Sequence, residues 1–397
     1  MFLKEEKYAM KKSPYKRALI WLSAGHFTTD IYSGFLNPIM PFIAAKIGIS
    51  MAIATVIMSI SQMFSSLLQP IFGFFADNYI KRVFIFWGVL LAAVFIPFSA
   101  CTNNLYTLLL FIILGSLGVS IFHPQSIGFV IRFTRHDFTK SMGVFLSLGS
   151  IGYAFGPAIS ATITQYFGLE KLPYTSIVGI LLAVIMFWCV PKISDRDKTP
   201  STNKDIIKVF SDIFKSNQFK ILLVISIMKA LTSSSCSILL PFLWKENGHS
   251  ALYIGTALFI FLFMGGIGSL MSPYFEKWLG TRKVIYISLL ITLPLMLIFA
   301  FTYKTIPFVS LLAFALLAFS IMLATPITMV LSQRELPQYK SIIGGFLNGF
   351  SWGIVGVAIG GLGFLAQKIG IMNVLIALYT IPIFCAYFVR YLKVYDD

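Results

Sequence analysis

Long apolar stretches alternate with short polar segments along almost the whole chain. Each stretch holds about 17 to 30 residues, enough to cross a hydrocarbon core of roughly 30 Å as a helix. The pattern therefore predicts twelve membrane-spanning helices, and the segments between them are too short to hold a soluble catalytic domain. The predicted spans are 18–46, 52–76, 83–101, 105–133, 139–168, 173–190, 218–245, 250–275, 283–303, 305–333, 341–368 and 372–391.

The longest polar segment, from Lys192 to Lys220, divides the chain almost in half. It predicts a central linker between two bundles of six helices. The expected parts are an N-terminal cytoplasmic tail at 1–17, a bundle at 18–190, a cytoplasmic linker at 191–217, a second bundle at 218–391 and a cytoplasmic tail at 392–397.

Within the linker, apolar residues recur at helical spacing between charged ones. This spacing is typical of a short helix that lies on a membrane surface, and a disordered linker is the alternative. The apolar residues are Ile206, Phe210, Ile213 and Phe214.

The two halves carry matching residues at a shift near 200 positions. The matches fall at corresponding points of each half, which favours duplication over chance. They are Pro41-Phe42 with Pro241-Phe242, Arg82 with Arg282, Ser141 with Ser341, Gly156 with Gly356, and Asp77 with Glu276. The expected fold is an all-α polytopic membrane protein, with twelve transmembrane helices in two pseudo-symmetric bundles and a substrate site between them near mid-membrane.

Composition and charge support this prediction. Hydrophobic residues make up 57% of the chain and charged residues 12%, against roughly 25% charged residues in soluble domains. With the N-terminus inside, 25 of the 31 Lys and Arg residues fall in cytoplasmic segments. The net charge of +16 therefore reflects membrane orientation and does not indicate nucleic-acid binding. Both termini are expected in the cytoplasm.

The sequence offers no set of residues typical of an enzyme. Four cysteines, Cys101, Cys189, Cys236 and Cys385, are widely separated and lack metal-ligand spacing. No Ser/His/Asp set or pair of carboxylates stands out, so an intramembrane enzyme is the disfavoured alternative. We expect no cofactor and no metal. The expected partners are a small-molecule substrate, protons and the lipid bilayer, and the chain is expected to be a monomer.

Asp30 is the one carboxylate of fifteen that falls well inside an apolar span. A charge there is costly unless it is paired, hydrated or protonated, so Asp30 is a candidate for proton exchange. His26, Asp30, Ser33 and Asn37 share one face of the first predicted helix, which makes His26 a second proton-coupling candidate and Asn37 a substrate-binding one. The alternative is a structural Asp30 that caps backbone freed by Pro38.

His123 lies on one face of the fourth predicted helix with Ser116 and Ser120, and Pro124 beside it should loosen the helix. His123 and Ser120 are therefore candidates for substrate binding. A neutral, hydrogen-bonded histidine of the core is the alternative reading of His123.

Lys229 is the one cation in the middle of a predicted span, on a face with Ser226, Ser233 and Ser237. The repeat places it opposite Asp30. We expect Lys229 to pair with Asp30 or to attract an anionic substrate, with Ser233 as a further substrate-binding candidate. The alternative is a side chain that snorkels to an interface. Polar residues also share one face of the tenth helix, at Thr325, Thr328 and Ser332.

The segment from Gly73 to Arg82 resembles the loop signature of the major facilitator superfamily, and the likeness covers essentially the whole chain. Gly73, Asp77 and the basic end match the signature, whereas Asn78 and Ile80 depart from it. The resemblance implies that Gly73, Asp77 and Arg82 form a cytoplasmic latch that opens when the halves rock.

The fifth predicted helix carries Gly152, Gly156 and Pro157, which looks like the Gly-x-x-x-Gly-Pro motif of antiporters in that superfamily. Glycines let helices approach closely and proline bends the backbone, which suits a hinge or a seal. The resemblance favours export. Ordinary packing of small residues is the alternative.

The run from His26 to Asp30 with Pro38 and Pro41, and the run Phe122-His123-Pro124, together resemble the fosmidomycin-resistance branch of bacterial drug exporters. The resemblance implies a multi-pass protein of the bacterial inner membrane. The function it predicts is proton-coupled export, by antiport, of a small polar or anionic organic compound or drug. The alternative is an importer of a metabolite or metal chelate.

Overall fold

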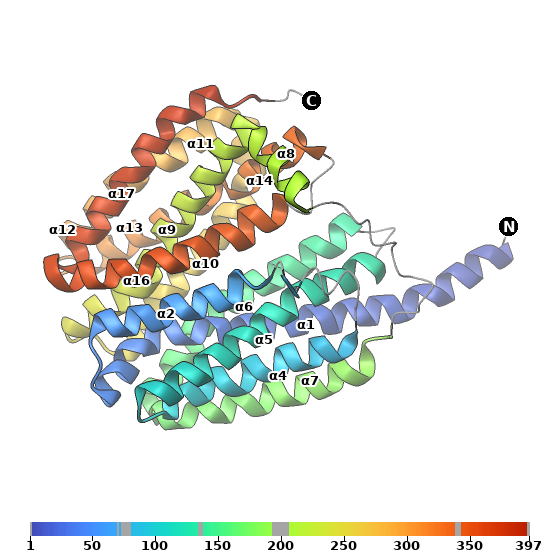
Figure 1. The fold of residues 1–397 in the computed structure, drawn as a ribbon, viewed down its shortest axis with the longest axis horizontal. Helices are drawn as coiled ribbons and strands as arrows, with labels where there is room; N and C mark the ends of the chain where they lie inside the picture. Colours follow the sequence, from blue (N-terminus) through green and yellow to red (C-terminus); the bar gives the residue numbers. More distant parts are fainter. Residues whose placement is uncertain are drawn as a thin grey trace. The chain divides into compact units, whose positions relative to one another are not determined.

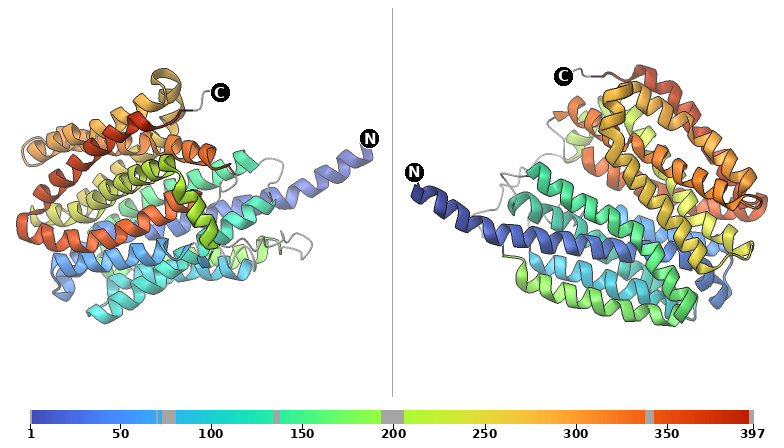
Figure 2. Two further views of the ribbon diagram at one scale, coloured as in Figure 1. Left: turned by 45° about the horizontal axis from the view of Figure 1, so that its top comes forward. Right: turned by 180° about the vertical axis from the view of Figure 1, so that it is seen from behind.

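The structure is a computed structural model, and it describes residues 2–69, 71–72, 81–133, 138–192, 206–337 and 343–394. The elements in these ranges are helices, and they form two compact units. Unit 1 comprises residues 1–39 and 68–201, and unit 2 comprises residues 40–67 and 202–397. Figure 2 shows that each unit is a bundle of long helices running side by side.

Helix α1, Phe2–Ile47, runs through the boundary between the units at residue 39. The other elements of unit 1 are α4 (Arg82–Phe98), η1 (Ser99–Cys101), α5 (Leu105–Phe133), α6 (Phe138–Phe167), η2 (Leu169–Thr175) and α7 (Ser176–Cys189). The other elements of unit 2 are α2 (Met51–Ser66), α8 (Ile206–Lys215), α9 (Asn217–Glu246), α10 (Ala251–Leu279), α11 (Thr281–Leu290), α12 (Thr292–Thr302), α13 (Pro307–Leu323), α14 (Thr325–Glu335), the π-helix η5 (Gly345–Phe350), α16 (Ser351–Ile369), α17 (Ile371–Phe388) and η6 (Val389–Tyr391).

Ten helical segments of the described chain are long and apolar enough to cross a membrane. They correspond to the third to twelfth predicted spans. Helix α1 contains the first predicted span, and α2 matches the second as far as Ser66. The fold is therefore the predicted all-helical, polytopic one. One difference is that α1 begins at Phe2, so the predicted tail at 1–17 is largely helical.

Two predicted spans are each divided into two helices by a proline. The span 283–303 becomes α11 and α12, with Pro294 in the first turn of α12, and 305–333 becomes α13 and α14, with Pro326 in the first turn of α14. Proline has no N–H for the carbonyl four residues earlier, and its ring crowds that carbonyl. The preceding helices therefore end near these carbonyls, at Leu290 and Leu323.

The repeat extends to the turns that follow α1 and α9. Gly48 and Gly248 both have positive φ, 74° and 80°, a conformation that glycine adopts without a steric cost. In both turns the N–H of the residue after the glycine donates a hydrogen bond to the carbonyl five residues earlier, as in the Schellman motif at helix ends. These bonds run from the N–H of Ile49 to the carbonyl of Ala44 (3.0 Å) and from the N–H of His249 to the carbonyl of Trp244 (2.9 Å).

The starts of the next helices match as well. The hydroxyl of Ser50 accepts a hydrogen bond from the N–H of Ile53 at 3.3 Å, and Ser250 does the same for Tyr253 at 3.2 Å. Each serine satisfies one of the N–H groups that a helix start leaves without a partner. The same serine cap therefore occurs at two positions 200 residues apart, and this match in backbone geometry supports duplication.

The core of unit 1 forms where α4 packs between α5 and α7. Gly88 of α4 lies directly against Phe122 of α5, and a Cβ at Gly88 would approach the Phe122 backbone to 2.9 Å. Phe122 is fully buried with Leu22 and Met186. This packing fixes the position of α5 at the residue before His123.

In unit 2, α2 lies alongside α16 (Figure 1). The Ser59 hydroxyl donates a hydrogen bond to the Gly356 carbonyl, and the Gln62 amide donates one to the Trp352 carbonyl at 2.9 Å. Gly363, further along α16, packs directly on Thr55. Small residues and hydrogen bonds between helices are the interactions by which helices associate in membranes.

The predicted linker helix is present as α8, and its apolar side faces the core of unit 2. Ile213 is fully buried, and the Phe214 ring lies 5.8 Å from that of Phe219 and 5.6 Å from that of Phe346. The side chain of Ile206 lies outside the described residues. A position on the membrane surface stays a prediction.

We predict that Gly363→Ala destabilises the protein, whereas Gly361→Ala in the same helix does not. A Cβ at residue 363 would overlap the Thr55 side chain, whose hydroxyl is held by the Ala52 carbonyl at 2.8 Å, and a Cβ at residue 361 would meet open space. Overpacking costs about 1–3 kcal/mol. Thermal unfolding in detergent should show a lower midpoint for Gly363→Ala only. Equal midpoints for the two variants would contradict the contact between α2 and α16.

Candidate functional site

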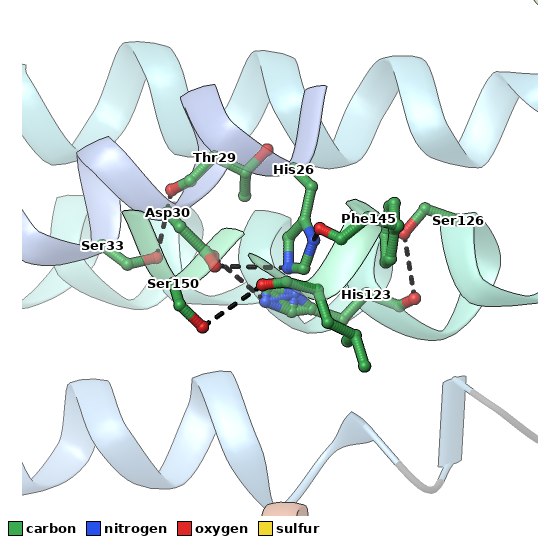
Figure 3. Close-up of polar contacts among 9 residues, drawn as sticks. His26, Thr29, Asp30, Ser33, His123, Ser126, Phe145 and Ser150 are labelled. Carbon is green, nitrogen blue, oxygen red and sulfur yellow. Dashed lines mark hydrogen bonds and ion pairs between the residues drawn. The ribbon is translucent and has the colours of Figure 1, made fainter. Parts of the chain in front are cut away.

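The Asp30 carboxylate contacts two imidazole rings inside unit 1, as Figure 3 shows. The Nε2 of His26 lies 3.2 Å from Oδ2, and the Nε2 of His123 lies 3.2 Å from Oδ1. His26 precedes Asp30 by one turn of α1, and α5 supplies His123. Each carboxylate oxygen therefore faces a different imidazole in a largely buried position.

His26 is held on its other side by α6. Its Nδ1 lies 2.8 Å from the Phe145 carbonyl, and its ring stacks on the Phe145 ring with centroids 4.1 Å apart. A Cβ at Gly149, one turn further along α6, would overlap the imidazole, so glycine makes room for it. A carbonyl oxygen can only accept a hydrogen bond. His26 Nδ1 therefore carries a proton and donates it to Phe145.

This orientation decides how His26 meets Asp30. With the Nδ1 proton committed to Phe145, a neutral His26 presents a lone pair at Nε2 to the Asp30 oxygen. Two acceptors at 3.2 Å attract each other only when a proton lies between them. The pair is therefore either an imidazolium with a carboxylate or a neutral imidazole with a carboxylic acid. In both forms it holds one exchangeable proton, and losing that proton replaces an attraction with a repulsion.

His123 completes the site from a loosened turn of α5. Pro124 has no N–H, so the Ser120 carbonyl lacks its usual helical donor, while the Ser126 hydroxyl donates to the His123 carbonyl at 3.0 Å. A neutral His123 can donate from Nε2 to Asp30. Its Nδ1 and the buried Ser120 hydroxyl have no hydrogen-bond partner among the described residues, so both are free to bind a ligand or water.

Asn37, two turns beyond Asp30 in α1, contacts a residue that the sequence analysis did not select. Its side chain shares a hydrogen bond with the hydroxyl of the half-buried Tyr153, which also interacts electrostatically with Asp30. Tyr153 belongs to the glycine motif of α6. Its place in that motif is the feature of the sequence that could have identified it as a site residue. Ser33 bonds instead to the Thr29 carbonyl of its own helix, at 3.1 Å.

The glycine motif of α6 lies directly against α1. A Cβ at Gly152 would overlap the Phe27 carbonyl, and one at Gly156 would overlap the Ile31 carbonyl. Pro157 packs beside Gly34. The glycines therefore allow the close approach that brings Tyr153 to Asn37, and a role in a hinge or seal stays a prediction.

Of the three residues predicted to form the cytoplasmic latch, the structure describes one, Arg82. Arg82 begins α4, and its guanidinium lies 4.7 Å from the centre of the Phe187 ring. Gly73 and Asp77 lie outside the described residues. The latch stays a prediction.

Lys229 of α9 lines a small pocket inside unit 2. Its ammonium is buried and has no hydrogen-bond partner in the part of the chain that the structure describes. Ser226, Thr325 and Thr328 line the same pocket, and Ser233 is buried outside this lining. The predicted pair with Asp30 would join the two units and stays a prediction.

The His26, Asp30 and His123 ligand atoms lie within 4.8 Å of one another. A divalent ion could bridge atoms at this spacing, because imidazole and carboxylate are common metal ligands. A proton between each imidazole and the carboxylate would satisfy the same atoms without a metal. The expectation of no metal stays a prediction.

A sequence model of the Major Facilitator Superfamily matches residues 22–361. The chain belongs to this superfamily. It is therefore a secondary transporter and a multi-pass membrane protein, and it is not an enzyme.

Relatives within the superfamily cover most of the chain. The chain is 24% identical over 366 residues to the fosmidomycin resistance protein of Escherichia coli (strain K12), covering 88% of this chain and 86% of that protein. It is 20% identical over 302 residues to the multidrug resistance protein MdtG of Escherichia fergusonii, covering 72% of each. The crystal structure of the nucleoside transporter NupG matches with a TM-score of 0.74 and 14% identity, covering 96% of this chain and 100% of that one. The last likeness concerns the fold alone.

We predict that His26 carries its Nδ1 proton in a hydrogen bond and that this bond depends on Gly149. Nitrogen-15 NMR of histidine-labelled protein, assigned with His26→Gln, should detect this proton. Gly149→Ala should shift or abolish its resonance, because the new methyl group displaces the ring. Gly143→Ala is the matched control, since a Cβ at that position of α6 meets open space. A His26 ring protonated only at Nε2 would contradict the orientation.

Proposed function

We propose that this transporter couples the movement of protons to the export of a small polar or anionic organic compound. The observation that carries the proposal is the carboxylate of Asp30 between two imidazoles, with His26 oriented by the Phe145 carbonyl. In this proposal Asp30 and His26 exchange the coupled proton, and His123 accepts or donates a bond at the same carboxylate.

The geometry supplies a physical link between the proton and the helices. His26 and Asp30 belong to α1, His123 to α5 and the Phe145 carbonyl to α6. When the proton between His26 and Asp30 is lost, the Asp30 carboxylate faces the lone pair of His26 Nε2 and the two repel each other. Moving either side chain relieves this repulsion. Proton release therefore alters contacts among three helices of unit 1, which is the kind of bistable element that alternating access requires.

The remaining candidate residues fall into two roles in this proposal. Those that contact the substrate are His123, Lys229, Asn37, Ser120 and Ser233. Those that serve the conformational change are Gly73, Asp77, Arg82, Gly152, Gly156 and Pro157. We further propose a monomer in the bacterial inner membrane with both termini in the cytoplasm, in keeping with the charge distribution.

Export is supported by the glycine-proline motif of α6 and by relatives that are named for resistance. The same fold can also carry a substrate inward. Among the relatives, a nitrite extrusion protein is named for export, and the name of a sialic acid transporter gives no direction. The direction therefore needs an experiment of its own.

We expect inverted vesicles with an acid interior to accumulate a transported compound, because an antiporter exchanges inside protons for outside substrate. A panel of labelled carboxylates, phosphonates and common antibiotics would be tested with and without an uncoupler. Right-side-out vesicles with an acid exterior should not accumulate it. Accumulation in right-side-out vesicles alone would identify an importer and refute export.

We predict that Asp30→Asn abolishes gradient-driven accumulation and keeps exchange of labelled for unlabelled substrate. The amide retains the size of the side chain and loses the exchangeable proton. Asp212→Asn, a carboxylate of α8 that pairs with Lys215 at 2.8 Å, is the control and should transport like the parent. Unaltered accumulation by Asp30→Asn would show that Asp30 is not the coupling residue.

Transport by the parent protein should persist in EDTA. Loss of transport in EDTA would instead indicate a metal at the two histidines.

A further inference from the structure

We propose that the pocket around Lys229 is a subsite for the oxyanion of the transported compound, a carboxylate or a phosphonate. The inference rests on the proposed transport of a small organic compound and names the group by which unit 2 recognises it. Four features of the pocket carry it: an ammonium without a counter-ion, the start of a half-helix, several hydroxyl groups and an apolar wall.

The Lys229 ammonium is the first feature. The side chain is 5% exposed, and its Nζ has no hydrogen-bond partner within the described residues. A buried ammonium loses its hydration, and this cost is recovered only when an anion or several acceptors surround it. The described residues that line the pocket include no Asp or Glu. The missing counter-charge can therefore come from a ligand.

The break between α13 and α14 supplies the second feature. Pro326 forces the chain to start a new helix at Thr325, and that residue lines the pocket. No side chain among the described residues caps this start by a hydrogen bond. The N-terminus of a helix carries a partial positive charge and N–H groups that favour anions. In membrane transporters, interrupted helices provide such ends at substrate sites.

Hydroxyl groups also line the pocket, at Ser226, Thr325 and Thr328. The Thr328 hydroxyl already donates to the Thr325 carbonyl at 2.9 Å, so Ser226 and Thr325 are the candidate donors to a ligand. The Thr325 hydroxyl is 3.7 Å from the Met322 sulfur. Sulfur is a weak acceptor, so Thr325 can turn to an oxyanion at little cost. Hydrogen bonds to charged groups are the stronger ones.

The size and the wall of the pocket indicate which part of a substrate it takes. Its volume is about 30 Å³, room for roughly two water-sized groups, so the pocket suits a small terminal group of a substrate and not a whole organic molecule. Met322, Met329 and Trp352 form an apolar wall beside the polar groups. The Gln62 amide holds the Trp352 carbonyl at 2.9 Å and the Ser234 hydroxyl at 3.1 Å, which fixes this wall against α9.

The test measures binding by the purified full-length protein in detergent, with no proton gradient. Benzoate and phenylphosphonate are the probes, and benzamide is the uncharged analogue of benzoate. Titration calorimetry and thermal unfolding should show saturable binding of both anions at millimolar concentration and a raised unfolding midpoint. Benzamide should bind at least about tenfold more weakly, because it lacks the charge that Lys229 and the start of α14 attract.

Variants assign the binding to the pocket. Lys229→Gln should lose about tenfold or more in benzoate affinity, and Thr325→Val, a change of similar shape, should lose a smaller factor. Lys245→Gln is the matched control: it removes the same charge from the same helix, at a side chain that donates to the Pro41 carbonyl outside the pocket. It should bind benzoate like the parent. If Lys229→Gln does not fold, Thr325→Val and the comparison of benzoate with benzamide carry the test.

Three results would overturn the subsite: no saturable binding of either anion, equal affinity for benzamide and benzoate, or parental affinity in both Lys229→Gln and Thr325→Val. Two separate assays distinguish this inference from the proton-coupling proposal: benzoate binding by the Lys229 and Thr325 variants tests the subsite, and gradient-driven accumulation by Asp30→Asn tests coupling. Failure of coupling at Asp30 with intact binding would leave the subsite standing. Loss of binding with intact coupling would remove the subsite alone.

Discussion

The burial of one carboxylate is the constraint on which the described arrangement of unit 1 depends. Asp30 lies in a membrane-spanning segment, where water cannot solvate its charge. An unpaired carboxylate there would make insertion into the membrane unfavourable. Two imidazoles replace that water, and each needs its own support. The Phe145 carbonyl orients His26, and the loosened turn before Pro124 presents His123. The glycines of α6 then follow as a requirement, because only small residues let α6 come close enough to α1 to supply that carbonyl.

The two units present complementary chemistry. Unit 1 holds an acid in contact with two imidazoles, and unit 2 holds a cation that lacks a hydrogen-bond partner among the described residues. These groups occupy matching points of the two sequence halves, since Asp30 and Lys229 stand 199 positions apart. Both halves therefore have a charged residue at the same place in their first helix, an acid in one half and a cation in the other. In the proposed mechanism, unit 1 exchanges the proton and unit 2 binds the anionic group of the substrate.

The turns after α1 and α9 show which parts of the repeat are visible in the sequence and which only in the structure. Matching prolines, arginines and glycines were visible in the sequence, but the paired Gly48 and Gly248 turns and the paired Ser50 and Ser250 caps were not selected. Glycine and serine are common in any membrane protein, so their identity carries little information. Their backbone conformation shows the correspondence, because a positive φ followed by a serine cap defines one specific path of the chain.

The sequence by itself determined the fold class, the helices and the residues most in need of partners. Long apolar runs have few ways to satisfy their backbone in a bilayer, which is why the span 105–133 and helix α5 coincide. The rarity of charge inside such runs singled out Asp30 and Lys229. Only the tertiary structure decided which groups meet them. The Phe145 carbonyl has no sequence signature, Tyr153 looked like part of a packing motif, and the pocket at Lys229 depends on where Pro326 interrupts a helix. Periodicity fixes the face on which a side chain lies, whereas its partners depend on how neighbouring helices pack.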